Sequence, residues 1–263
     1  MKSKYLILSG IFLIFTLLTS ADKLVDEYKV IKVTGKILYK NSGKVMSTGD
    51  VFNSNVPLKF SSDNSRAAVI SKSKGRFVLA PPSKSQKTNL VPAVNNISSR
   101  SGGIVNELDL KNHFSGNYLI LDRLELPINE KSFPQDKKHF FFLSYQYRGE
   151  KIAKKLPSDG NKLILDKNDI FSIDGKSIAP FNTEMILFYR DASSKENVMI
   201  SKFNPIFPDN ESLKKEVEVI LNEYSEKTEE KKFNEIKGYL TEFYGKPYDD
   251  NLNEWLEQFS SSK

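Results

Sequence analysis

The spacing of apolar side chains changes once along this chain, after Pro208, and this change constrains the fold more than any other feature. Upstream, apolar and polar residues alternate over short stretches such as residues 33–40, which is the two-residue period of a strand. Downstream, Leu213, Val217 and Ile220 recur at steps of three and four, the period of a helix with one apolar face. The sequence therefore predicts an α+β protein, mainly β, with strands first and helices last.

The first 21 residues are typical of a secretory signal peptide. Lys2 and Lys4 precede an apolar run of 13 residues over 6–18, and three small residues at 19–21 come just before Asp22. The apolar run is shorter than the roughly 20 residues with which a helix crosses a bilayer. We therefore expect cleavage before Asp22 and export to the periplasm or outer surface, with no stable transmembrane segment in the mature chain. An uncleaved membrane anchor is the alternative.

Composition limits how the exported chain is held together. It contains no cysteine, which excludes disulfides, thiol catalysis and cysteine-bound metals. Hydrophobic residues make up 39% of the chain, enough to supply a core, so packing must stabilise the protein. Its length allows one large domain or two ordinary ones.

Residues 28–82 are predicted to form a small β domain, because short strands alternate with turn residues at even spacing. Two of the turns contain glycine, at Gly43 and at Gly49. We expect Gly49, beside Asp50, to adopt a positive φ, which glycine adopts without a steric penalty. Turns at this spacing are typical of a small barrel or sandwich.

The order of these strands and turns resembles the FecR-type β domain. The segments that carry the resemblance are Val33–Ile37, Ser47–Val51, Leu58–Phe60, Ser65–Val69 and Gly75–Leu79. They are similar to that family's first strand, its glycine–aspartate turn, its alanine-containing strand and its glycine-led last strand. The resemblance covers residues 28–82 and implies a fold only. The anti-sigma regulatory role of FecR-type proteins is not expected here.

Residues 83–116 are predicted as an irregular connector, with a short helix over residues 104–113. The stretch 95–103 is polar and lacks periodicity, and such loops commonly form binding surfaces. Arg100 is its only charge, and a guanidinium suits a carboxylate or phosphate on a partner. We therefore take Arg100 and the adjacent Ser101 as candidate binding residues. A charge that is simply solvated is the alternative.

Residues 117–208 are predicted to form a second β domain, resembling an immunoglobulin-like sandwich without its cysteine pair and tryptophan. The run Phe140–Leu143 is predicted as a central strand buried on both faces. The predicted strands are 118–128, 138–147, 151–156, 162–165, 184–189 and 197–203.

Residues 209–263 are predicted as an acidic helical tail. Asp209 and Thr228 are candidate N-caps, and a third, shorter helix is expected from Asp250. The tail carries 8 basic and 14 acidic side chains, whereas residues 22–82 carry 11 basic and 5 acidic ones. Because short helices with exposed apolar stripes are unstable alone, we expect the tail to pack on the chain's own β domains. A tail that instead completes an interface with a partner is the alternative.

The sequence contains no motif for catalysis, metal binding or a cofactor. Its two histidines, His113 and His139, lack the spacing of a metal site and are predicted to be structural or exposed. Basic residues are dispersed and export leads away from nucleic acid, so a nucleic-acid partner is not expected. We therefore expect a non-catalytic envelope protein that binds another envelope protein or an anionic polymer. A polysaccharide- or peptidoglycan-acting hydrolase with a noncontiguous acidic site is the alternative.

Overall fold

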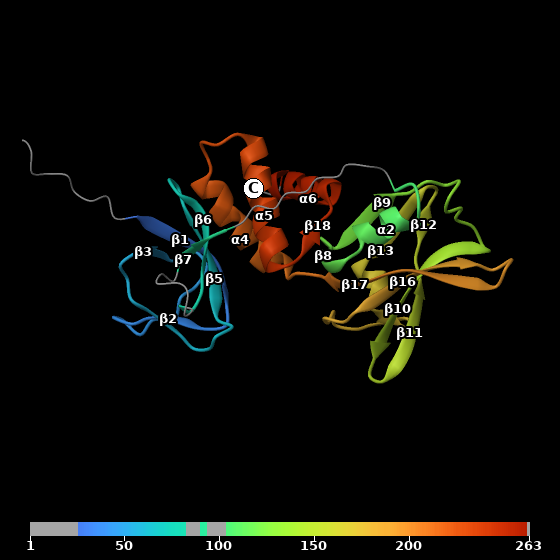
Figure 1. The fold of residues 1–263 in the computed structure, drawn as a ribbon, viewed down its shortest axis with the longest axis horizontal. Coiled ribbons are helices and arrows are strands. Elements are labelled where there is room, and N and C mark those ends of the chain that lie inside the picture. The colour runs from blue at the N-terminus through green and yellow to red at the C-terminus, as the bar shows by residue number, and fades with distance from the viewer. Residues whose placement is uncertain (1–25, 83–89, 94–103, 262–263) are drawn as a thin grey trace, which may run out of the picture.

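The computed structural model describes residues 26–82, 90–93 and 104–261. Strands dominate, and the last part of the chain is helical, which confirms the predicted α+β class. Figure 1 shows two β regions at opposite ends of the long axis, with the C-terminal helices between them. The predicted signal peptide, residues 1–21, lies outside the described residues. No helix in the described part of the chain is both long and apolar enough to cross a bilayer.

The first β region is an antiparallel sheet with its own apolar core. Its strands pair in the order β3-β1-β5-β6-β7, and β2 pairs separately with β4. Val30, Ile37, Val69 and Leu79 are among the side chains that form the core on one side of the sheet. Gly49 has a φ of 87°, as predicted, and its N–H donates to the carbonyl of Val30. The strands are β1 (Glu27–Thr34), β2 (Ile37–Tyr39), β3 (Val51–Asn53), β4 (Leu58–Phe60), β5 (Arg66–Ser71), β6 (Gly75–Leu79) and β7 (Leu90–Pro92).

The stretch predicted as an irregular connector contains regular structure. β7 lies within it and extends the first sheet by pairing with β6, which adds backbone hydrogen bonds that a loop would lack. Helix α2 (Glu107–His113) matches the expected short helix, and Asn106 and Asp109 form a capping box at its start. Residues 83–89 and 94–103 lie outside the described residues.

The second β region contains a six-stranded and a three-stranded sheet. The larger sheet has the order β11-β10-β16-β17-β8-β18, in which β18 (Lys246–Pro247) belongs to the tail. The smaller sheet has the order β12-β13-β9. Both contribute to one core, in which Leu124 and Leu163 of the smaller sheet join Phe141 and Leu187 of the larger. The elements are β8 (Gly116–Leu119), β9 (Arg123–Pro127), β10 (His139–Tyr147), β11 (Glu150–Lys155), β12 (Ser158–Asp159), β13 (Lys162–Asp166), α3 (Lys167–Ile170), β14 (Ser172–Ile173), β15 (Lys176–Ser177), β16 (Met185–Asp191) and β17 (Glu196–Ile206).

The single strand predicted over residues 118–128 is two strands in different sheets. β8 pairs with β17 in the six-stranded sheet, and β9 pairs with β13 in the three-stranded sheet. Asp122 has a φ of 62°, a left-handed conformation that aspartate tolerates better than most residues, and this turns the chain between the two strands. Apolar residues occur on both sides of Asp122, consecutively at 118–121 and alternately at 124 and 126, and the sequence analysis interprets them as one continuous strand.

The prediction that Phe140–Leu143 is buried on both faces is wrong. β10 is central, between β11 and β16, but only Phe141 and Leu143 of this run are buried in the core. Phe140 and Phe142 point to the other face and are half-buried. The larger sheet is therefore covered on one face by its core and carries aromatic rings on the other.

The tail consists of three helices and a short strand that begin and end at local sequence signals. Asp209 accepts a hydrogen bond from the N–H of Ser212, and Thr228 accepts one from the N–H of Lys231, so both predicted N-caps are confirmed. The third helix begins at Asp249, one residue before its predicted start. The elements are α4 (Asn210–Glu223), α5 (Glu229–Phe243), β18 (Lys246–Pro247) and α6 (Asp249–Ser261).

The tail packs on both β regions. Its buried side chains, such as Leu213, Ile220 and Leu240, share one core with Ile31 and Ile70 of the first sheet. Leu119 and Leu121 of the second region belong to the same core. This confirms the predicted packing of the tail on its own chain, and Figure 1 shows the helices as the element between the two sheets.

Ion pairs join the basic first sheet to the acidic tail. Arg76 of β6 has a side chain only 1% exposed and contacts Glu235 at 2.7 Å and also Glu242, both on α5. Lys32 of β1 contacts Glu216 of α4 at 2.9 Å. A buried guanidinium is strongly unfavourable unless it is paired and hydrogen-bonded, so these carboxylates fix the position of the tail on the sheet.

A glycine lets the end of the tail join the second region. β18 pairs with β8 in parallel, directly after Gly245. A Cβ at Gly245 would lie 2.5 Å from the carbonyl oxygen of Asn117, too close for any other residue without a backbone shift. The tail is thus tied to the first sheet by charge and to the second by backbone hydrogen bonds.

Loss of the buried cation should destabilise the whole protein. Arg76→Ala leaves Glu235 and Glu242 facing each other without their cation, and we expect the free energy of unfolding to fall by about 3–5 kcal/mol. Lys72→Ala is the matched control, because Lys72 lies in the same β5–β6 hairpin and pairs with Glu226 in the open, with side chains 59% and 80% exposed. Its effect should stay below about 1 kcal/mol. Equal effects of the two substitutions in urea unfolding would contradict this interpretation.

Candidate functional site

The two residues predicted as a binding site, Arg100 and Ser101, lie outside the described residues. Within residues 26–82, 90–93 and 104–261, no group of three or more histidine, aspartate or glutamate side chains could hold a metal ion. Three other features are candidates for a functional site: a histidine between two carboxylates, a polar groove beside the tail, and the aromatic face of the six-stranded sheet.

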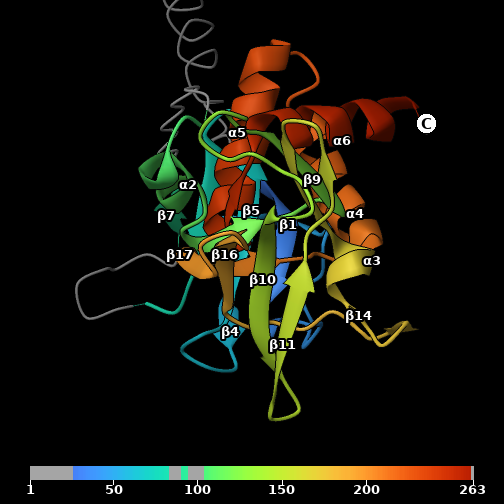
Figure 2. The same ribbon diagram turned by 90° about the vertical axis from the view of Figure 1, so that its right-hand side faces the viewer.

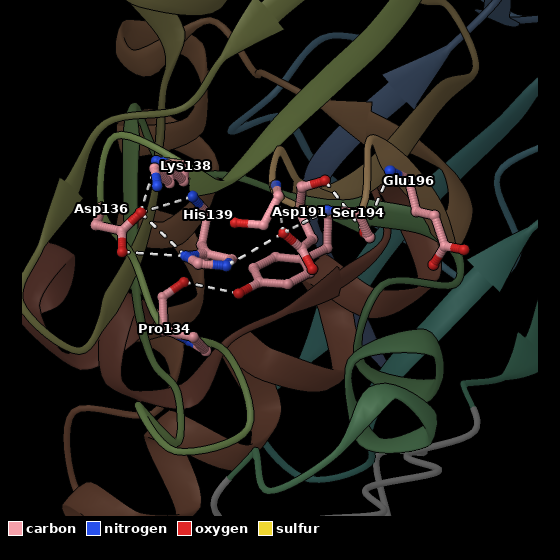
Figure 3. Close-up of polar contacts among 9 residues, drawn as sticks. Pro134, Asp136, Lys138, His139, Asp191, Ser194 and Glu196 are labelled. Carbon is pink, nitrogen blue, oxygen red and sulfur yellow. Dashed lines mark hydrogen bonds and ion pairs between the residues drawn. The ribbon is translucent and has the colours of Figure 1, made fainter.

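His139 is the first residue of β10 and lies between two carboxylates, as Figure 3 shows. Its Nδ1 is 3.0 Å from Oδ2 of Asp136, which lies in the turn before the strand. Its Nε2 is 3.3 Å from Oδ1 of Asp191, the last residue of β16. Beside them the hydroxyl of Tyr189 donates to the carbonyl of Pro134 at 2.8 Å. Residues from two strands and a turn therefore meet at one end of the sheet.

The two carboxylates favour the protonated form of the histidine. The hydrogen bond with Asp136 raises the pKa of His139 above its ordinary value, and the charges of Asp136 and Asp191 add to this. The same hydrogen bond, together with two backbone N–H donors, lowers the pKa of Asp136 to about 2. Both ring nitrogens of His139 are engaged, so a protonated ring has no free nitrogen for a substrate. The cluster is suited to clamping strand ends together rather than to acid–base catalysis.

His113 is the opposite case. Burial, and to a lesser extent the charge of Lys246, lower its pKa to about 4. The ring stays neutral and its Nε2 lies 2.6 Å from the hydroxyl of Tyr118. It packs against Phe114 as part of the core around α2. This arrangement agrees with the prediction that His113 is structural.

A groove of about 270 Å³ lies where α4 and α6 meet the start of β9. Nε1 of Trp255 donates to Asn210 within it. Its carboxylate Glu125 accepts from Lys162 at 2.8 Å and from Arg123 at 2.9 Å, and these bonds lower the pKa of Glu125. A glycosidase general acid needs a raised pKa, so Glu125 is paired as in a structural ion pair and is unsuited to donate a proton. Side chains that line the groove include Arg123, Glu125, Asn210, Asn251, Glu254 and Trp255.

The face of the six-stranded sheet that points away from its core carries an apolar strip. Phe142 of β10 pairs with Phe188 of β16, and their rings stack with centroids 4.9 Å apart and planes 7° apart. Phe188 pairs with Met199 of β17, which is 51% exposed. Phe140 and Ile186 flank these positions and are half-buried. Directly paired residues point to the same side of a sheet, so these side chains form one continuous surface.

Cationic side chains lie next to the apolar residues of this strip. Lys155 of β11 pairs with Phe142, and its ammonium lies 4.4 Å from the centre of the Phe140 ring. Arg190 pairs with Phe140, and Lys202 pairs with Ile186. Within the described residues, the one carboxylate in contact with any of these three cations is that of Glu184, 3.9 Å from Lys202. We call this surface the outer sheet face; its members are Phe140, Phe142, Lys151, Lys155, Ile186, Phe188, Arg190, Met199 and Lys202. Figure 2 shows β10 and β11 side by side on the near side of the molecule.

We call the cluster of Asp136, His139 and Asp191 the histidine clamp. Sequence reasoning missed both this clamp and the outer sheet face. Asp136 and His139 are three residues apart and gave a local signal, but Asp191 joins them only through the pairing of β10 with β16. The signal for the outer sheet face was the run Phe140–Leu143 itself, because four successive large apolar residues must place two on each face. Nothing in that run says which face is covered.

No protein-family model matches this chain, and no curated protein matches it. Its function is therefore inferred from the geometry described above.

The two histidines should affect stability with opposite dependence on pH. Because the folded pKa of His139 is raised, its contribution is complete below the unfolded value near 6.5 and is lost as pH rises through the folded pKa. His139→Gln should therefore destabilise more at about pH 5.5 than at about pH 9. Because the folded pKa of His113 is lowered, the unfolded chain binds the extra proton, and wild-type stability falls as pH drops from about 6.5 toward 4.

His113→Gln is the internal comparison for this experiment. The free energy it removes should be smaller at about pH 5.5 than at about pH 9, opposite to the His139 variant. Urea unfolding of both variants and the wild type at the two pH values gives the comparison. The same direction of change for both variants would contradict the clamp assigned to His139.

Proposed function

We propose that this protein is an exported, non-catalytic binding or assembly module of a larger cell-envelope or secretion structure. The order of the first 21 residues, which is that of a signal peptide, supports export. The binding role rests on the outer sheet face.

The proposal includes a finer description of the fold. We propose that the first β region has a FecR-type fold and that the second is a sandwich. The strand order around β1, β5 and β6 and the positive φ of Gly49 support the first part. The core shared by the six-stranded and three-stranded sheets supports the second.

The observation that carries the binding role is the outer sheet face. A soluble protein rarely leaves a continuous apolar strip on a sheet without a use for it, and a strip rimmed by charge is typical of an interaction site. Phe142 and Phe188 form the centre of the strip, and Met199 extends it with half of its surface exposed. Aromatic and methionine side chains are enriched at the centres of interfaces.

The hydrolase alternative depends on the groove beside the tail. Glu125 and Glu254 both line it, together with Trp255, and a pair of carboxylates with an aromatic ring is what sugar hydrolysis uses. The lowered pKa of Glu125 does not suit a general acid, because such a group must hold its proton near neutral pH. We therefore favour binding over hydrolysis.

Export predicts a defined mature end. The protein recovered from the cell envelope should begin at Asp22, because the small residues at 19–21 end the apolar run. N-terminal sequencing of envelope material measures this directly. Material that still begins at Met1 would show that the segment is retained as an anchor.

Envelope binding should depend on the outer sheet face. Met199→Glu places a carboxylate within the apolar strip, and we expect the fraction of purified protein that co-sediments with isolated envelopes to fall about tenfold. Val51→Glu is the matched control, because Val51 is also on a strand and is 52% exposed, against 51% for Met199. It lies in the first β region, away from this face, and should bind as the wild type does. Equal loss in both variants would refute the assignment of the binding role to the outer sheet face.

A further inference from the structure

The chemistry of the outer sheet face restricts what can bind there. Its centre is aromatic, because the rings of Phe142 and Phe188 come from neighbouring strands and stack on each other, which leaves their edges and outer faces to a ligand. Around that centre, Lys155, Arg190 and Lys202 come from three different strands. A ligand that matches this surface has flat apolar faces and negative charges that alternate at short intervals.

We propose that the occupant is an anionic polysaccharide whose sugar rings carry carboxylates. The C–H face of a pyranose ring is apolar and packs on an aromatic ring, and its carboxylate lies at the ring's edge, where a cation can reach it. This proposal deepens the proposed binding function and rests on it, since it names the ligand class of the same surface.

The direction of the surface suits a linear polymer. Neighbouring strands lie about 4.8 Å apart, so the path from β11 across β10 and β16 to β17 is about 14 Å long. Along that path a chain meets Lys155, then the rings of Phe142 and Phe188, then Met199 and Lys202. Several sugar units would contact the protein at once, which lets individually weak contacts sum to useful affinity.

Other occupants fit this face less well. A second copy related by a two-fold axis would bring Lys155, Arg190 and Lys202 against the same cations of its neighbour, which is repulsive. A membrane surface requires apolar side chains that reach past the headgroups, whereas Phe140 and Phe142 are half-buried within the sheet. The polysaccharide satisfies both the rings and the charges.

The edge of the six-stranded sheet next to this surface, formed by β11, is not suited to pairing with a further strand from a protein partner. β11 is the edge strand of the sheet, and it carries Lys151, Lys154 and Lys155 within six residues. Lysines on an edge strand oppose pairing with another strand, because an added strand would remove their charged ammonium groups from water. The face itself, rather than its edge, is therefore the binding surface.

The test compares three soluble polymers by isothermal titration with the mature protein. Polygalacturonate carries sugar rings with carboxylates, poly-L-glutamate carries carboxylates without rings, and dextran carries rings without charge. We expect polygalacturonate to bind about tenfold more tightly than poly-L-glutamate, because only it can use the rings, and dextran to bind weakly or not at all. Equal binding of the two polyanions would overturn the proposal and leave only charge attraction.

Variants locate the site. Phe188→Ala removes one of the stacked rings, and Lys155→Gln with Arg190→Gln removes two cations from the face. Each should weaken polygalacturonate binding about tenfold, while thermal melting confirms that the variants are folded. The matched control is Lys131→Gln with Lys176→Gln, which removes the same charge from exposed positions elsewhere. A control that loses as much affinity as the face variants would overturn the assignment of the site.

The outcome separates this proposal from the proposed function. If polygalacturonate does not bind but Met199→Glu still abolishes envelope binding, the outer sheet face is a binding surface and the ligand class is wrong. Protease treatment of the envelopes before sedimentation then shows whether a protein is the ligand. If neither polymer nor envelopes bind, both proposals fall together.

Discussion

Arg76 is withdrawn from water between two carboxylates of α5, and the arrangement of the whole chain depends on that contact. A buried guanidinium is tolerated only where acceptors surround it, so α5 can dock on the first sheet in essentially one position. Lys32 and Glu216 repeat the pairing one helix away, and the hydroxyl of Tyr239 donates to the same carboxylate at 2.6 Å. Apolar burial provides most of the attraction between tail and sheet, whereas these ion pairs fix its geometry.

The placement of the second β region follows from the placement of the tail. Leu119 and Leu121 belong to the same core as Ile31 and Ile70, although the two pairs come from different β regions. Asn251 of α6 is buried, and its amide donates to the backbone carbonyl of Arg123 at 2.7 Å. The helices therefore act as a spacer, because their buried side chains pack on both β regions.

Local signals in the sequence predicted the features that depend on a few neighbouring residues. Asp209 and Thr228 could be identified as N-caps because a cap bonds to residues within its own helix. The acidic tail and the basic first sheet indicated self-packing, since their charges are opposite and apolar stripes need cover. Features set by long-range pairing could not be predicted in this way. Three such features are the turn at Asp122, the pairing of β18 with β8 and the approach of Asp191 to His139. Each depends on the order of strands in a sheet, which the sequence does not show.

The histidine clamp and the outer sheet face are two sides of the same pair of strands. In the register of β10 and β16, His139 pairs with Asp191 on the core side, and the next pair, Phe140 with Arg190, points to the outer sheet face. Asp136 and Asp191 hold the end of β10 against the end of β16 through the one imidazole. This contact helps to hold the two strands in register, and the register sets the spacing between the ring of Phe140 and the cation of Arg190. Preorganisation of this kind lowers the entropy lost when a ligand binds, because the strand ends are already held in register. In the proposed binding function the role of the clamp is geometric: it holds the two strands in register and does not itself contact the ligand.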